Sequence, residues 1–296
     1  MKNFVYGDKK DAFYTEMAID CIEKKNNDFT KTQQLGFVEK FVTNIKTEQI
    51  AKELGKPRGV YVTIDVKKSS LNDSDKNFLI KVLGNSIKDM SIYSGGVKKN
   101  ILIVGLGNGG LVADSLGPEA AGRVKVTRNI IKEGMNSRFL KSLASVAPNV
   151  YGKTGIESFD VVKGIITQIK PDLVIAIDTL CTSKVGRIGK SFQLSTAGIE
   201  PASGVNGGRT GLNFSTLKVP TLAIGVPLVA KLDKVIFNAI SSYDLKMKRE
   251  TDAGKFSQIL VESNLPGLII APKEIDVLTD WAANIIAEAI NYAAFG

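Results

Sequence analysis

Residues 100–118 read NILIVGLGNGGLVADSLGP, and this stretch decides the expected fold class. Its apolar run at 101–104 ends in Gly105, a pattern typical of a strand buried on both faces of a parallel sheet. Further apolar runs follow at residues 173–177, 221–225 and 268–270. Apolar and polar residues alternate at 59–66, which predicts another strand. The chain is therefore expected to build a sheet whose central strands are parallel.

Helical segments separate these strands. Apolar residues recur at helical spacing at residues 17–22, 37–45, 75–91, 158–170 and 272–294. Pro272 suits the first turn of the last of these helices, where its missing N–H costs nothing. Strands that alternate with helices predict the α/β class, a mostly parallel or mixed sheet flanked by helices. Because no repeat divides the 296 residues, we expect a single domain.

The composition excludes several catalytic schemes. No histidine occurs in the chain, so neither a Ser-His-Asp triad nor a Cys-His pair can form. A zinc site built on histidine is excluded for the same reason. A hydrolase with this composition must use carboxylates, lysine, or a metal held by oxygen and sulfur. The two cysteines, Cys21 and Cys181, are too few for a disulfide framework and are expected to be reduced thiols.

The charge balance is mildly basic, with 39 Lys and Arg against 30 Asp and Glu, a net charge of +9. The cations are scattered and lack interleaved aromatic residues, so we expect no dedicated nucleic-acid site. No apolar run approaches the roughly 18 residues of a membrane span, and the N-terminus has no signal-peptide pattern. The sequence therefore favours a cytoplasmic protein without a membrane segment.

The glycines that follow the strand at 101–104 allow two interpretations. Residues 105–110 read GLGNGG and match the G-x-G-x-x-G pattern of a dinucleotide-binding turn. Pro118 argues against it, because a helix starting near Gly109 would carry this proline in its interior. The acidic residue that should end a second strand about 20 positions on is also absent. A dinucleotide-binding protein therefore remains the weaker alternative.

Two aspartates stand beyond the predicted strands. Asp114 lies on the loop after the strand at 101–104, and Asp178 directly follows the run at 173–177. The carboxyl ends of parallel strands border the crevice where α/β proteins bind ligands, so the two carboxylates can face each other there. Each also has a structural interpretation: Asp114 as a helix cap, and Asp178 as a turn residue.

Several segments, in order along the chain, resemble the germination protease family. They are GLGN at 105–108, DSLGP at 114–118, APNVYGKTGIE at 147–157, PDLVIAID at 171–178, the glycine-rich stretch 198–205, AIGVP at 223–227 and PKEID at 272–276. The similarity extends from about residue 12 to the end of the chain. It implies a phosphorylase/hydrolase-like α/β fold, shared with hydrogenase maturation proteases. It also implies an endopeptidase that begins the degradation of small acid-soluble spore proteins during germination, in the forespore or spore core.

The resemblance also assigns residues. The two essential aspartates of the family fall on Asp114 and Asp178, and the glycine loops supply a possible oxyanion or substrate-binding element at Gly105, Gly107, Asn108 and Gly204. No cofactor and no metal are expected. A homo-oligomer, a tetramer by family resemblance, is implied. The alternative from the same fold is a processing protease of the hydrogenase-maturation kind, although those enzymes use a histidine that this chain lacks.

The resemblance also implies that the protein is made as a zymogen that removes its own N-terminal segment. Residues 15–20 read TEMAID and resemble the acidic-then-apolar sequence that such proteases cut. We therefore predict cleavage between Glu16 and Met17, with residues 1–16 as propeptide and 17–296 as the protease domain. The structural interpretation is a helix that starts here, with Thr15 as its N-cap and Glu16 in its first turn, and it is compatible with cleavage.

Overall fold

The structure is a computed structural model, and it describes residues 14–22, 29–96, 99–132, 141–199, 210–247, 259 and 268–296. The elements of the first half are β1 (Thr15–Glu16), α1 (Ala18–Ile22), β2 (Thr30–Leu35), β3 (Val38–Ile45), α2 (Glu48–Leu54), β4 (Gly59–Val66), α3 (Asp73–Tyr93), β5 (Asn100–Gly105), η1 (Val112–Asp114), α4 (Leu116–Arg123), α5 (Arg128–Lys132) and β6 (Ser142–Val146). Those of the second half are α6 (Tyr151–Thr154), α7 (Ser158–Ile169), β7 (Leu173–Thr182), η2 (Val185–Arg187), β8 (Ser191–Ser195), α8 (Phe214–Leu217), β9 (Thr221–Lys231), α9 (Leu232–Met247), β10 (Ile269–Ile270) and α11 (Ile275–Phe295).

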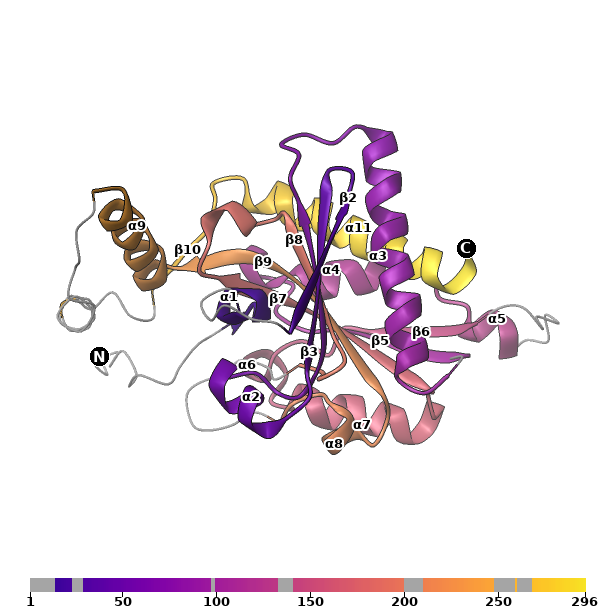
Figure 1. The fold of residues 1–296 in the computed structure, drawn as a ribbon. Helices are drawn as coiled ribbons and strands as arrows, with labels where there is room; N and C mark the ends of the chain where they lie inside the picture. The colour runs from indigo at the N-terminus through magenta and orange to yellow at the C-terminus, as the bar shows by residue number, and fades with distance from the viewer. Residues whose placement is uncertain are drawn as a thin grey trace.

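One mixed sheet runs through the molecule in the order β2-β3-β4-β8-β9-β7-β5-β6 (Figure 1). The pairs β5–β6, β5–β7 and β7–β9 are parallel, and the pairs from β2 to β9 through β4 and β8 are antiparallel. The short strands β1 and β10 pair with β7 and β9. A mixed sheet in an α/β domain was predicted from the sequence, and this prediction is confirmed.

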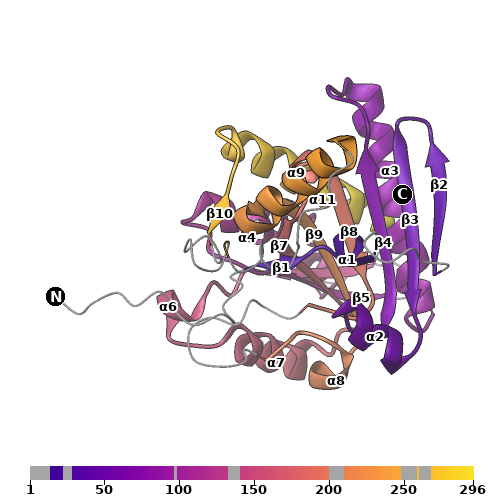
Figure 2. The ribbon, with the colours of Figure 1, turned by 60° about the vertical axis from the view of Figure 1, so that its left-hand side comes forward.

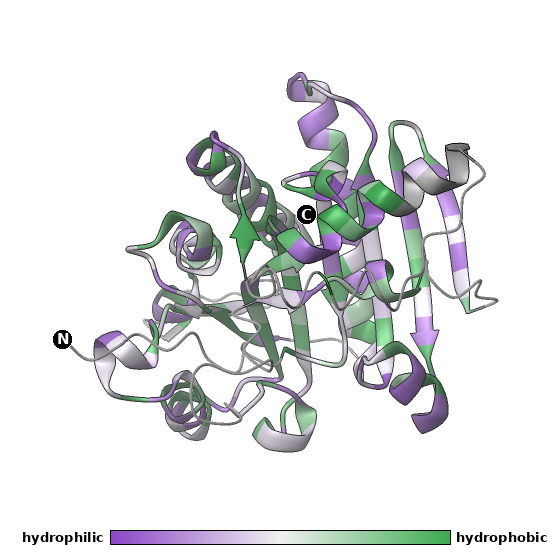
Figure 3. Cartoon of the chain, turned by 90° about the vertical axis from the view of Figure 1, so that its left-hand side faces the viewer, coloured by the Kyte–Doolittle hydropathy of each residue, from purple (hydrophilic) through white to green (hydrophobic). Residues whose placement is uncertain are grey.

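Helices cover both faces of the sheet, with α4 and α11 on one side and α7 and α8 on the other (Figure 2). The central strands supply apolar side chains to both sides. Ile101 and Ile103 of β5 pack in the larger core with α3, α4 and α11, whereas Leu102 and Val104 pack in the core of α7 and α8. Figure 3 shows the same distribution, with hydrophobic strands at the centre of the molecule. Burial of both strand faces explains why these segments read as unbroken apolar runs.

Three sequence-based boundaries are wrong. The segment 37–45 was predicted as a helix but forms β3, half of an antiparallel hairpin with β2. Side chains on both faces of β3 are partly buried, so its apolar and polar residues do not alternate. The resulting spacing of apolar residues resembles that of a helix. The last helix begins at Ile275, and Pro272 precedes it. The strand at 173–177 continues to Thr182, which places Asp178 inside β7.

No helix in the described part of the chain combines the length and the apolar character that crossing a lipid bilayer requires.

Candidate active site

The loop after β5 folds back onto Asp114. At Gly107 the backbone has φ +109°, and a Cβ added there would lie 2.1 Å from the main-chain oxygen of Asp114. The next amide, that of Asn108, donates a hydrogen bond to Asp114 Oδ2 at 2.9 Å. Only glycine allows this close approach and this backbone conformation. The glycine loop therefore binds the carboxylate of Asp114 and fixes its position.

Asp178 directly follows Ile177, the residue that pairs with Gly105 at the end of β5. It belongs to β7, the parallel neighbour of β5, and its Oδ1 accepts a hydrogen bond from the Thr179 amide at 2.9 Å. Gly117 joins the two sites, because a Cβ on this residue would lie 2.1 Å from Leu106 O and 2.5 Å from Ile177 O. The start of α4 thus packs closely against Leu106, just after β5, and against Ile177 in the middle of β7. Asp114 and Asp178 both remain partly exposed there.

Tyr14 packs with Cys181 and Val229, and Ala113, the residue before Asp114, packs against the same cluster. Its side chain is buried, and its pKa is raised to about 12, first by burial and then by the negative charges of Asp114 and Asp178. The phenol therefore stays protonated at any physiological pH. No pattern in the sequence had pointed to Tyr14.

The dinucleotide interpretation of the glycine loop does not fit this geometry. The loop is followed by the single turn η1, and the next helix, α4, begins only at Leu116. A pyrophosphate would need free amides at a helix N-terminus directly after the glycines. Here the Asn108 amide binds Asp114, and Gly110 N donates to Asn108 Oδ1 at 2.9 Å.

The predicted cleavage bond lies between β1 and α1. Thr15 and Glu16 form β1, which pairs with β7, and α1 begins only at Ala18, so the alternative of Thr15 as a helix cap is wrong. The Met17 side chain is fully buried, and its amide donates to Cys181 O at 3.0 Å. The Glu16–Met17 bond is therefore held against the sheet.

The other residues singled out in the sequence are the glycines of the two glycine-rich loops and the cysteines. Gly105 is the last residue of β5, Gly107 and Asn108 belong to the loop that binds Asp114, and Gly204 lies outside the described residues. Cys181 is buried, and burial raises the pKa of its thiol to about 12, so it is a packing residue and not a nucleophile. Among the described residues, no cluster of three or more Cys, Asp or Glu side chains could hold a metal ion.

The sequence profile of the germination protease family matches residues 16–265. The chain belongs to the germination protease family. Curated germination proteases that resemble it include those of Clostridium acetobutylicum, 32% identical over 94% of both chains, and of Bacillus subtilis, 30% identical over 94% of this chain and 92% of the relative. The relative from Caldanaerobacter subterraneus is 33% identical over 85% of this chain and 84% of its own length.

Membership in the germination protease family makes this chain a peptidase, as the sequence predicted. Among solved structures, the [NiFe] hydrogenase maturation protease HycI from Thermococcus kodakarensis aligns with it. That alignment has a TM-score of 0.36 and 19% sequence identity, and it covers 69% of this chain and 98% of HycI.

The glycine loop of this germination protease offers a matched pair of substitutions. Gly107→Ala is expected to lower kcat at least tenfold, because the new Cβ would displace Asp114 and because alanine is strained at this φ, at a cost of about 1–3 kcal/mol. In Gly110→Ala the Cβ meets mainly Lys153 Nζ, the movable end of an exposed side chain, at 2.6 Å. This control should retain activity. Steady-state cleavage of a peptide substrate measures both, and equal activities would contradict the role given to Gly107.

Sequence reasoning missed several side chains around β1. Lys56 Nζ donates to Glu16 O at 2.6 Å, and Lys231 Nζ lies 3.5 Å from Glu16 Oε2. The Gln193 side chain accepts from the Ala18 amide at 2.6 Å. These residues come from the segment after α2, from the end of β9 and from β8. No local pattern could have found them, because only the fold brings them together.

Proposed function

We propose that this chain is the endopeptidase that begins the degradation of small acid-soluble spore proteins in the spore core, and that Asp114 and Asp178 perform the chemistry. The observation that supports the mechanism is that the two aspartates belong to adjoining segments of the fold. Two partly exposed carboxylates, one in the turn that follows the β5 loop and one within the neighbouring parallel strand β7, belong to segments that the close packing of Gly117 brings together, in a chain without histidine. The substrate class comes from the family to which the chain belongs.

Two carboxylates that share one proton can divide the work of hydrolysis. The ionised carboxylate takes a proton from a water molecule as its oxygen attacks the peptide carbonyl carbon. The protonated carboxylic acid gives its proton to the departing amine nitrogen when the C–N bond breaks. The proton count then returns to its starting value. The Asn108 and Gly110 amides already donate within the loop, so the main-chain amides of Gly107 and Gly109 are the candidates to stabilise the oxyanion.

Digestion of a purified small acid-soluble spore protein tests the proposed function. We expect cuts at a few defined positions, mapped by mass spectrometry of the fragments. An unrelated unfolded protein of similar size serves as the control and should be cut far more slowly. Equal rates on both proteins, or no cleavage of the spore protein, would contradict the proposal.

Processing of the N-terminus is a separate prediction. Glu16 and Met17 lie in the site region, so we propose that residues 1–16 are removed and that the mature chain begins at Met17. After incubation at acidic pH, N-terminal sequencing should give a chain that starts with Met-Ala-Ile-Asp. The Asp178→Asn variant should remain intact under the same conditions. Fully active protein that still begins at Met1 would refute this prediction.

A further inference from the structure

A cavity of about 200 Å³ lies near the first residues of β5 and β7 and is lined by the last turns of α3 and α11. The two helices pack against each other on the same face of the sheet (Figure 1). Ile101 and Ile175 of the lining are buried whereas Ile92 is exposed, so the cavity reaches from the core to the surface. Further apolar residues of the lining include Ile87, Ile290 and Ala294.

Two half-buried lysines line the same cavity. Lys141, directly before β6, donates through Nζ to Ala293 O at 2.9 Å. Lys88, on α3, donates through Nζ to Gly296 O at 3.0 Å. The ion pairs of the described residues include neither lysine. Because an ammonium group has three N–H donors, both lysines can bind a further acceptor.

The two cations disfavour each other in this setting. Burial, and next the charge of Lys88, lower the pKa of Lys141. Burial acts because the ammonium group loses part of its water, and the second lysine acts because like charges repel. A negative charge bound between the two ammonium groups would oppose both effects. An apolar cavity with two cations in its wall therefore fits a ligand that has an apolar tail and an anionic end.

We propose that this cavity binds an aliphatic monocarboxylate, with its tail among the isoleucines of the lining and its carboxylate between Lys88 and Lys141. The volume sets the size of the tail. An apolar cavity of roughly 150 Å³ takes benzene, so about 200 Å³ suits a chain of roughly eight carbon atoms. Hydrogen bonds from an ammonium group to a carboxylate are among the strong ones, and here they would form at the edge of an apolar surface.

The cavity is separate from the two aspartates. Ile101 is the second residue of β5, whereas the loop that binds Asp114 begins after Gly105, the last residue of this strand. At about 3.3 Å per residue, the strand between Ile101 and Gly105 spans about 13 Å. A carboxylate bound between the lysines should therefore not contact the aspartates, and the inference does not depend on the proposed function.

Calorimetric titration of the full chain with octanoate tests the proposal. We expect one molecule to bind per chain, with a dissociation constant of about 0.1–1 mM for a ligand of about ten heavy atoms. Lys88→Met and Lys141→Met each keep an unbranched apolar side chain but remove a cation, and each should weaken binding by about tenfold or more. Lys81→Met is the matched control, because Lys81 is an exposed lysine of the same helix α3, and it should bind as the wild type does. Urea unfolding confirms that each variant is folded.

Related ligands test the same site on the unmodified protein. Octan-1-ol has the tail without the charge, and 2-aminooctanoate adds an ammonium group that would meet the two lysines, so both should bind about tenfold more weakly than octanoate or worse. The Asp178→Asn variant should bind octanoate as the wild type does, which separates this site from the aspartates. No binding at about 10 mM octanoate, or equal binding by the wild type and both cavity variants, would overturn the proposal. A loss of binding in Asp178→Asn alone would also overturn it.

Discussion

Asp178→Asn is expected to lower kcat for peptide cleavage by about 10²- to 10⁴-fold, the usual contribution of a general acid or base. Asparagine has the same shape and can still accept the hydrogen bond from the Thr179 amide, so the fold should be preserved. It cannot take up or release a proton. Asp114→Asn should have a similar effect, because its side-chain oxygen can still accept from Asn108 N.

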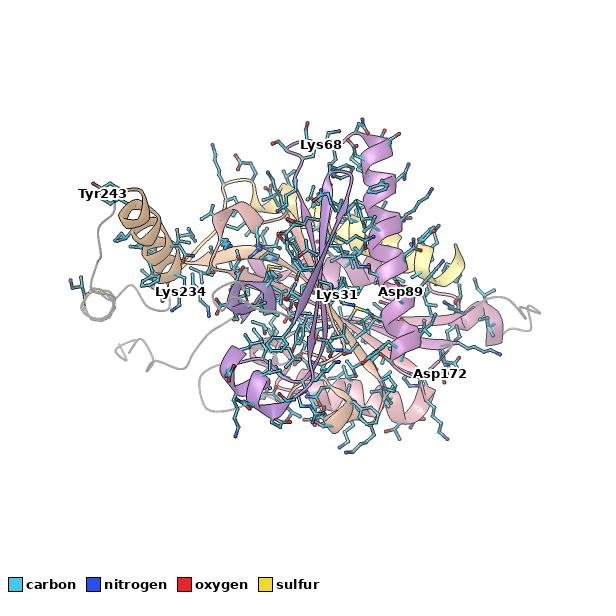
Figure 4. The ribbon with its side chains drawn as sticks, viewed as in Figure 1. Lys31, Lys68, Asp89, Asp172, Lys234 and Tyr243 are labelled. Carbon is cyan, nitrogen blue, oxygen red and sulfur yellow. The ribbon has the colours of Figure 1, made fainter. Side chains whose placement is uncertain are left out.

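The two substitutions should not be additive. If the carboxylates act as one unit that shares a proton, the double variant should be hardly slower than either single variant. Asp172→Asn is the matched control. This residue stands just before the first residue of β7, at the other end of the strand (Figure 4), and its Oδ2 accepts from the amides of Lys99 and Asn100. It should retain full activity. If Asp114→Asn and Asp178→Asn both still digest a spore protein, the carboxylate mechanism fails.

The central strands were predictable because their environment is uniform. β5, β7 and β9 are buried on both faces, and few structures besides a buried strand produce a short, unbroken apolar run between polar residues. The β2–β3 hairpin at the edge is different. β2 is largely exposed and the side chains of β3 are mostly half-buried. The order of apolar and polar residues in these two strands therefore depends on what each side chain contacts in the fold, and it shows no simple strand period.

The candidate site likewise contains residues that the sequence could predict and residues that it could not. Asp114 and Asp178 became plausible because each follows a recognisable apolar run, and the resemblance to the germination protease family then assigned them as the catalytic pair. β1 could not be predicted, since a strand of two residues has no period to detect. Lys231 lies 215 residues from Glu16 in sequence, and only the pairing of β1 with β7 shows that the two side chains meet. The spacing of residues along the sequence cannot predict a contact that depends on the register of one strand against another.

A buried charge network anchors the chain directly after the predicted cleavage bond. Arg187 binds Asp20 through Nη1 and lies 3.3 Å from Asp65 Oδ2 through Nε, and all three residues are at most 6% exposed. Thr182 Oγ1 and Ser183 N donate to Asp20 Oδ2 at 2.6 and 2.7 Å. The network ties α1 to β4 and to the end of β7. None of these contacts comes from the described residues 14–16, so α1 should stay in place after cleavage.

Arg187→Met should reduce the free energy of unfolding by about 3–5 kcal/mol, because it leaves the buried Asp20 without its arginine partner and leaves Asp65 with only Lys67, whose Nζ lies 3.8 Å away. That loss is a large part of the roughly 5–15 kcal/mol that stabilises a typical domain. Urea unfolding measures it, and the transition midpoint should fall while its slope stays unchanged.

Arg123→Met is the matched control, since it removes an arginine that also has two carboxylate partners. Arg123 lies 2.8 Å from Glu119 and 2.7 Å from Asp280, but these pairs are at the surface, and the Arg123 side chain is 30% exposed. Water screens them and already solvates the carboxylates, so its loss should cost only about 0–1 kcal/mol. If the two variants unfold at the same urea concentration, burial adds nothing to the Arg187 pairs. The anchoring of α1 would then have to come from the apolar contacts of Ala18 and Ile22.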